Sequence, residues 1–295
     1  MIFMSYETKG YAKIFLAGCL WGTIGIFVKM MERSGSGATY TSFIRLFFAF
    51  LLLVLLTLFL DGAKAFRVGK RTLLSCVLFG VVCQGLDNVL YSLSISYNGV
   101  AVASGLAYTA PVFTGVLSFL IFRERLPIYR WAALLVNALG CMLTATGGAM
   151  SGDGIIPLGI LIGIGSGLTY AMTAIFGRIA MQENASPFAV AMYNAFFGCA
   201  FVAIVSHPWT SVAAPLDGQL LLIGLFYAMI PTVAAYLLYF SGISHIKQTS
   251  KVPVVASVEL IVAALIGVCV FREAISAGNA VGIVLVLLSI FLFSK

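Results

Sequence analysis

Three ionisable side chains, Arg45, Asp87 and Glu259, occur within long apolar stretches of the sequence. A charge near the centre of a lipid bilayer costs about 2.5 to 3.5 kcal/mol on insertion scales, so each of them would need water, a partner or a proton there. By helical rise, Arg45 and Asp87 would lie roughly 10 and 12 Å from the outer ends of their helices. We therefore predict an intramembrane ion pair between Arg45 and Asp87, which serves either as a structural clamp or in substrate contact and gating.

Glu259 would lie near the middle of its stretch, roughly 13 Å from the inner end by helical rise, and we expect no basic residue at that level. Because an apolar environment disfavours the charged form of a carboxylate, we predict that Glu259 is at least partly protonated at neutral pH. It would then be a proton-coupling site, with Asp87 as the next candidate. The alternative is a neutral carboxylic acid that hydrogen-bonds to a neighbouring helix.

Four polar side chains share one face of a predicted helix, because they are spaced i, i+3, i+4 and i+7. They are Gln84, Asp87, Asn88 and Tyr91. Lipid cannot satisfy such a face, so it lines a cavity or packs against another polar helix. We expect a cavity, since four hydrogen-bonding groups in succession are hard to satisfy by packing alone.

Aromatic residues with polar tips also occur well inside the apolar stretches, where those tips need partners. They are Trp21, Tyr91, Tyr108, Tyr170, Tyr236 and Tyr239. Singly, each ring would be interpreted as core packing. Together with the polar stripe, they indicate a cavity for an apolar, aromatic or cationic metabolite. The predicted substrate-binding residues are Trp21, Gln84, Asp87, Asn88, Tyr91, Tyr108, Tyr170, Tyr236 and Tyr239.

The chain that holds these residues has a composition that excludes a water-soluble fold. Of its 295 residues, 61% are hydrophobic and only 9% are charged, whereas a globular domain is about 25% charged. A helix crosses the bilayer with about 20 apolar residues. We therefore predict an all-α integral membrane protein with ten transmembrane helices. They are expected at residues 11–31, 38–60, 72–95, 99–122, 129–149, 155–177, 188–206, 218–242, 250–271 and 277–294.

Most of the 17 Lys and Arg residues fall on one side of this arrangement, the side that holds both termini. Because basic loops stay in the cytoplasm, we predict a multi-pass protein of the cytoplasmic membrane with both termini cytoplasmic. The formal charge of +7 then reflects contact with anionic membrane lipid, and no nucleic-acid partner is expected. The first stretch lacks a cleavage site of small residues and is expected to be retained.

The two halves of the sequence align with each other at a shift of 149 residues. Aligned positions include Trp21 with Tyr170, and Phe122-Arg123-Glu124 with Phe271-Arg272-Glu273. We therefore predict two five-helix repeats, residues 1–149 and residues 150–295. Because five is odd, the second repeat enters the bilayer from the opposite side. Inverted repeats of this kind expose a central site alternately to either face in secondary transporters. The alternative is an inert helical bundle left by a gene duplication.

Three segments of the sequence carry a family resemblance. They are Leu20-Trp21-Gly22, Ala110-Pro111-Val112-Phe113 through Phe122-Arg123-Glu124-Arg125-Leu126, and Val258-Glu259-Leu260 through Phe271-Arg272-Glu273. On these segments the sequence resembles the EamA branch of the drug/metabolite transporter superfamily, over essentially the whole chain. The resemblance implies a ten-helix transporter with a central cavity that commonly exports amino acids or related metabolites. The family often has Pro after the glutamate, where Leu260 stands here, so the bend expected there would depend on Pro253.

We therefore predict a secondary active transporter that moves a small organic metabolite by alternating access, with export and proton coupling as the finer hypotheses. The partners expected are the small-molecule substrate, membrane lipid and the proton, and the protein would be a monomer or a homodimer. No cofactor is expected, because the sequence has no G-x-x-x-x-G-K-[ST] phosphate loop. No metal site is expected, since His207 and His245 fall on opposite sides of the membrane.

Three other functions remain open from the sequence. A membrane-embedded lipid-modifying enzyme would need a polar catalytic group near one interface, whereas the polar residues here lie mainly in the middle of the spans. A carrier of lipid-linked or nucleotide-linked sugars would need basic residues clustered inside the spans to bind a diphosphate. A non-catalytic structural subunit, in turn, would tolerate neutral Asp87 and Glu259 without loss of any solute flux.

Overall fold

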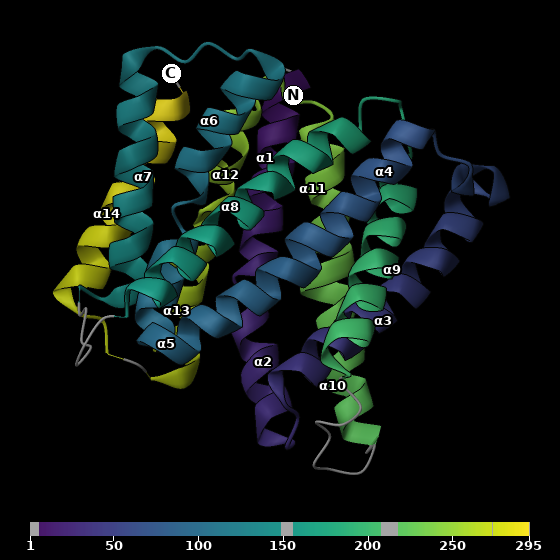
Figure 1. Ribbon diagram of the computed structural model, residues 1–295, viewed down its shortest axis with the longest axis horizontal. Coiled ribbons are helices and arrows are strands. Elements are labelled where there is room, and N and C mark those ends of the chain that lie inside the picture. Colours follow the sequence, from purple (N-terminus) through teal and green to yellow (C-terminus); the bar gives the residue numbers. More distant parts are fainter. Residues whose placement is uncertain (1–5, 149–155, 208–217, 273, 295) are drawn as a thin grey trace. The chain divides into compact units, whose positions relative to one another are not determined.

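The computed structural model describes residues 6–148, 156–207, 218–272 and 274–294. In these ranges the chain is helical and contains no β-strand (Figure 1). The α-helices of the first half are α1 Tyr6–Trp21, α2 Ile24–Arg33, α3 Ala38–Leu56, α4 Lys70–Leu78, α5 Asp87–Ala107, α6 Ala110–Phe122 and α7 Ile128–Thr146. Those of the second half are α8 Pro157–Ala180, α9 Pro187–Ser206, α10 Gly218–Ala228, α11 Ala235–Ile243, α12 Val252–Ala256, α13 Val258–Phe271 and α14 Ala277–Ser294.

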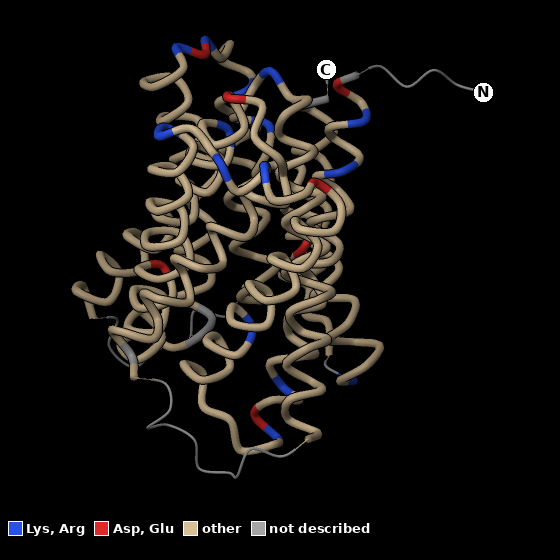
Figure 2. The backbone as a smooth tube through the Cα atoms, turned by 90° about the vertical axis from the view of Figure 1, so that its right-hand side faces the viewer, with Lys and Arg blue, Asp and Glu red and all other residues tan. Residues whose placement is uncertain are grey.

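The ten predicted spans are confirmed. Within the described residues, nine helical stretches are long and apolar enough to cross a membrane, and the tenth, Ala277–Leu292, is a shorter apolar helix. The predicted span ends at Ala149 and Ile155 lie outside the described residues. Large apolar side chains such as Phe59 and Ile204 are exposed, as expected where helices face lipid. Figure 2 shows few charged positions between the helix ends.

Three spans are interrupted next to a residue whose hydroxyl bonds back to its own chain. The first span breaks between α1 and α2, the fourth between α5 and α6, and the ninth between α12 and α13. The hydroxyls of Thr23, Thr109 and Ser257 donate to the carbonyl three residues earlier at 2.7, 2.7 and 2.6 Å. Each bond satisfies a backbone carbonyl near a break, where lipid offers no donor.

Proline accounts for one of these breaks and for one further distortion. Pro111 lies in the first turn of α6, and Pro231 lies in a π-helical segment of the eighth span, as expected of residues that cannot donate a backbone hydrogen bond. The ninth span breaks at Ser257 although Leu260 stands where the family has Pro. Pro253 lies in the first turn of α12, the short helix that ends at this break. The interruption therefore does not require the missing proline.

The repeat is visible in local backbone geometry. The residues that follow α6 and α13, Arg123 and Arg272, both adopt left-handed backbone with φ of 56° and 55°. Residues other than glycine seldom adopt this conformation, so the coincidence supports the alignment of the two Phe-Arg-Glu motifs. The π-helical segments Phe79–Leu86 and Met229–Ala234 also occupy equivalent positions at the shift of 149 residues.

The chain forms two compact units, and neither coincides with a sequence repeat. Unit 1 comprises residues 1–85 and 176–245, and unit 2 comprises residues 86–175 and 246–295. In unit 1, α3 packs against α9 and α10, and α1 packs against α11. In unit 2, α7 packs against α14, α6 and α13. Each unit therefore consists of helices from both repeats.

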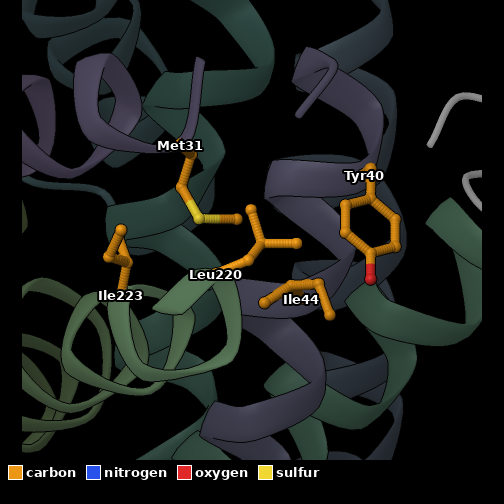
Figure 3. Close-up of a cluster of buried hydrophobic side chains, with 5 residues drawn as sticks. All are labelled: Met31, Tyr40, Ile44, Leu220 and Ile223. Atoms are coloured by element: carbon orange, nitrogen blue, oxygen red, sulfur yellow. The ribbon is translucent and has the colours of Figure 1, made fainter. Parts of the chain in front are cut away.

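An apolar cluster of unit 1 connects α2, α3 and α10 (Figure 3). It consists of Met31 of α2, Tyr40 and Ile44 of α3, and Leu220 and Ile223 of α10. All five side chains are buried. Because they come from the last turns of α2 and the first turns of α3 and α10, their packing holds these three helix ends together.

Glycines let the helices of unit 2 approach closely. A Cβ added at Gly163 of α8 would lie 2.6 Å from Leu106 Cδ1 of α5. A Cβ added at Gly282 of α14 would lie 2.3 Å from the backbone nitrogen of Thr144 of α7. Small residues at such contacts are typical of membrane helices, whose packing relies on close van der Waals contact.

Candidate functional site

The Glu259 carboxylate lies in the first turn of α13, directly after the break at Ser257. Tyr170 of α8 donates its hydroxyl to Glu259 Oε1 at 2.7 Å, and the Tyr108 side chain makes a second hydrogen bond to this carboxylate. The rings of Tyr108 and Tyr170 pack edge to face with centroids 6.5 Å apart. All three residues belong to unit 2. An acid within a span is thus held by two neutral hydroxyl groups.

A buried polar network lies next to this acid. Asn137 of α7 is fully buried, and its Nδ2 donates to Ser257 Oγ at 3.0 Å and to Ser289 Oγ at 2.7 Å. The Cys141 thiol donates to Asn137 Oδ1 at 3.7 Å. The network joins α7 and α14 to the break that precedes α13. Because satisfied buried networks favour one arrangement of their helices, we infer that it fixes the start of α13 and therefore the position of Glu259.

The Asp87 carboxylate is bound by hydroxyl groups of unit 2. Ser166 and Thr169 of α8 donate to Asp87 Oδ1 at 2.7 and 2.8 Å. One turn further along α5, the Tyr91 hydroxyl lies 2.6 Å from Ser104 Oγ. Both Asp87 and Tyr91 are half-buried. The second half of the predicted polar stripe therefore faces α8 and the end of α5, with its polar atoms in hydrogen bonds.

Unit 1 holds an aromatic group that includes three of the predicted residues. Trp21 packs edge-on against Tyr236 with centroids 5.4 Å apart, and it packs against Tyr239 at 5.2 Å. Gln84 Nε2 donates to the Tyr236 hydroxyl. Gln84 and Tyr239 are buried. The hydroxyl of Tyr236 thus has the kind of partner that a tyrosine inside a membrane span requires.

Arg45 of α3 is half-buried and belongs to unit 1. Its Nη2 lies 3.4 Å from Gln84 Oε1, and its Cζ lies 5.5 Å from the centre of the Tyr227 ring. The Nε atom is buried and has no hydrogen-bond partner in the described part of the chain. Asp87 belongs to unit 2. The ion pair between Arg45 and Asp87 would have to join the two units, and it stays a prediction.

The structure places the nine predicted substrate-binding residues in two groups. Unit 1 holds Trp21, Gln84, Tyr236 and Tyr239, and unit 2 holds Asp87, Asn88, Tyr91, Tyr108 and Tyr170. The prediction of one polar face from Gln84 to Tyr91 assumes α-helical spacing. The segment Phe79–Leu86, which contains Gln84, is π-helical, and a π-helix has a wider turn than an α-helix. The common face of these four residues stays a prediction.

Comparison with known proteins identifies the family of this chain. Its sequence matches the EamA-like transporter family twice, over residues 8–146 and residues 157–295. The chain belongs to the EamA-like transporter family. Together with the nine apolar spans and the shorter apolar helix of its described residues, this membership makes it a multi-pass membrane transporter.

Relatives of this EamA protein are themselves named as transporters. It is 29% identical over 282 residues to an uncharacterized transporter of Archaeoglobus fulgidus. The alignment covers 96% of this chain and 95% of the relative. It is 26% identical over 295 residues to the uncharacterized inner membrane transporter YicL of Salmonella typhimurium. That alignment covers 99% of this chain and 97% of the relative. A solved crystal structure aligns with a TM-score of 0.77 over 97% of this chain and 96% of that chain, at 17% identity. This last similarity concerns the fold alone.

Sequence reasoning missed several polar residues of this EamA protein that the structure places beside the predicted acids. Ser166 and Thr169 bind Asp87, and Asn137, Ser257 and Ser289 form the network beside Glu259. Serine and threonine are common in membrane helices because their hydroxyls bond to their own backbone, so they gave no signal. Asn137 did offer one, since an amide in the middle of an apolar span needs partners from other helices.

Proposed function

We propose that this EamA protein is a secondary active transporter that exports a small organic metabolite, an amino acid or a related compound, across the cytoplasmic membrane. Both termini would be cytoplasmic, and a site exposed alternately to the two faces would move the solute. Membership in the family supports transport itself. The proposal adds the class of solute, the direction and a role for Glu259 as the proton-coupling site, with Asp87 as the second candidate.

The observation that carries the proposal is the environment of Glu259. A charge at the depth expected for this residue costs about 2.5 to 3.5 kcal/mol. The hydroxyls of Tyr170 and Tyr108 stabilise a carboxylate by hydrogen bonding, but they do not neutralise it. Protonation is therefore the route by which Glu259 loses its charge inside the membrane. Uptake of that proton on one face and its release on the other would couple solute export to the proton gradient.

The aromatic group of unit 1 supports an apolar or aromatic solute. Trp21, Tyr236 and Tyr239 offer ring faces together with hydroxyl and indole groups. Mostly apolar walls with a few polar groups are typical of sites for small metabolites. The half-buried Tyr108 and Tyr170 provide a similar combination beside Glu259 in unit 2.

The test is transport in proteoliposomes with a panel of amino acids, amines and nucleosides. We expect the wild-type protein to exchange at least one solute in counterflow and to respond to an imposed pH gradient. A Glu259→Gln variant keeps a side chain that accepts hydrogen bonds but cannot exchange a proton, so it should retain counterflow and lose the response to the pH gradient. The matched control is Glu7→Gln, in the first turn of α1, which should retain both.

An undiminished response to the pH gradient in Glu259→Gln would rule out coupling at this carboxylate, and Asp87→Asn would then be the variant to measure. Failure of the wild-type protein to exchange any solute of the panel would refute the proposed solute class. That result would favour the lipid-modifying enzyme or the carrier of lipid-linked or nucleotide-linked sugars.

A further inference from the structure

The guanidinium group of Arg45 carries a charge that its own unit does not neutralise. In the described part of unit 1, its contacts are the Gln84 amide and the ring of Tyr227, and both are neutral. Its Nε is buried without a hydrogen-bond partner. A guanidinium group carries a positive charge in proteins. Among the described residues of unit 1, this half-buried cation therefore has a donor to spare and no anionic partner.

The residues around Arg45 indicate what kind of group could be attached to such an anion. Gln84 connects the guanidinium to the aromatic group, since its Oε1 accepts from Arg45 and its Nε2 donates to the Tyr236 hydroxyl. Tyr236 in turn packs against Trp21. If the anionic end of a ligand bound to Arg45, its apolar body could therefore contact the rings of Tyr236 and Trp21.

The apolar cluster of unit 1 lies on one side of this position. Ile44 directly precedes Arg45 in α3, and Ile223 lies one helical turn before Tyr227 in α10, so both precede the two polar residues along their helices. Figure 3 shows these isoleucines packed with Met31 and Leu220. These packed apolar side chains lie nearer the beginnings of α3 and α10 than Arg45 and Tyr227 do. Shielding from water strengthens the attraction between a guanidinium group and an anion.

We infer that Arg45 is the binding residue for the carboxylate of the transported solute. The inference rests on the proposed function and adds the substrate class, a monocarboxylate with an apolar or aromatic body. The unused Nε together with a neighbouring Nη can bind both oxygens of a carboxylate in the bidentate geometry that arginine favours. A single guanidinium balances one negative charge, whereas a phosphate dianion would leave charge uncompensated in the membrane. Among the described residues of unit 1, the carboxylate would displace no ion pair of Arg45.

The experiment compares solutes that differ only at the acidic end. The panel consists of an amino acid with an aromatic side chain, its carboxamide, the amine without the carboxylate, and an organic monophosphate of similar size. Wild-type protein in proteoliposomes should exchange the carboxylate roughly 10- to 100-fold faster than the carboxamide, as expected for a charge-assisted hydrogen bond. In detergent, the carboxylate alone should raise the melting temperature of the purified protein.

Two variants of Arg45 and one control locate the effect. Arg45→Gln should lose the preference for the carboxylate over the carboxamide. Arg45→Lys keeps the charge but loses the bidentate geometry, so it should retain a weakened preference, and it serves as the second variant where the glutamine protein does not fold. Arg33→Gln, at the exposed end of α2, should behave as wild type.

Several outcomes separate this inference from the proposed function. Equal exchange of the carboxylate and the carboxamide by wild-type protein would overturn the inference while leaving solute transport intact. Preference for the monophosphate would overturn the substrate class. Restored carboxylate exchange in an Arg45→Asp/Asp87→Arg double variant would show that Arg45 serves Asp87 instead of the solute. No exchange of any panel member would refute the proposed function and this inference together.

Discussion

Replacement of Asn137 by leucine tests whether the polar network holds α13 in place. Asn137 donates two hydrogen bonds, to Ser257 and Ser289, from a fully buried position. Each is worth about 0.5 to 1.5 kcal/mol, and similar bonds in a membrane protein average about 0.6 kcal/mol. Both serine hydroxyls also donate to carbonyls of their own helices, so neither is left without any bond. We therefore expect Asn137→Leu to lower the free energy of unfolding by about 1 to 3 kcal/mol.

The assay is thermal unfolding of the purified protein in detergent, in which this loss corresponds to a melting temperature lower by roughly 2 to 12 °C. The matched control is Asn194→Leu in α9. Asn194 is also buried, but its Oδ1 has no hydrogen-bond partner among the described residues, so this variant should melt at or above the wild-type temperature. If Asn137→Leu melts like Asn194→Leu, the network does not stabilise the fold and the reasoning is refuted.

A double-mutant cycle separates the network from the general effect of a larger apolar side chain. Ser289→Ala removes one acceptor of the Asn137 amide. In wild-type protein, Ser289→Ala should lower the free energy of unfolding by about 0.5 to 1.5 kcal/mol. In the Asn137→Leu protein the same substitution should lower it clearly less, because the hydrogen bond is already absent. Equal costs in the two backgrounds would show that the two side chains are not coupled.

The remaining predictions concern single contacts. Gly282→Ala should destabilise the protein by about 1 to 3 kcal/mol, because the new Cβ would lie 2.3 Å from a backbone nitrogen of α7. The control is Gly25→Ala, whose new Cβ would have nothing within 4 Å. It should be neutral or stabilising in the same melting assay. Glu124→Ala should cost about 1 to 2 kcal/mol, since its carboxylate accepts from two backbone N–H groups at the start of the ninth span, and an exposed control, Glu32→Ala, should cost nothing measurable. Tyr170→Phe removes one donor to the site acid and should change the pH dependence of transport while leaving the yield of folded protein near that of wild type; an unchanged pH profile would count against the coupling role.

The spans and the unusual charges could be predicted because both depend on local sequence. A membrane helix is a run of about 20 apolar residues, and a charge such as Arg45 or Glu259 stands out within one. The partners of those charges could not be predicted. Which of the many serines and threonines meets Asp87 depends on how α8 is rotated against α5, and hydropathy carries no information on that rotation. The structure shows that Ser166 and Thr169 do so.

The interruptions of the helices were predictable only where proline marks them. Pro111 lies at a break and Pro231 at a distortion, as is typical of a residue that has no backbone donor. The break at Ser257 follows Pro253, on which the expected bend depended, whereas the break between α1 and α2 and the π-helical segment Phe79–Leu86 have no proline to mark them. The predicted polar stripe from Gln84 to Tyr91 rests on 3.6 residues per turn, and that value does not hold through a π-helix.

Each compact unit is assembled from helices that lie far apart in the chain, and this has a consequence for biogenesis. The helix α1 packs against α11, and α3 packs against α9. The ribosome makes α9 and α11 only after residues 86–175, the first segment of unit 2. The helices α1 and α3 must therefore remain in the membrane without their final packing partners until most of the protein has been synthesised. A chain truncated after the first repeat would lack α9 and α10, which pack against α3, and α13 and α14, which pack against α7. Neither unit could reach its native arrangement from that fragment alone.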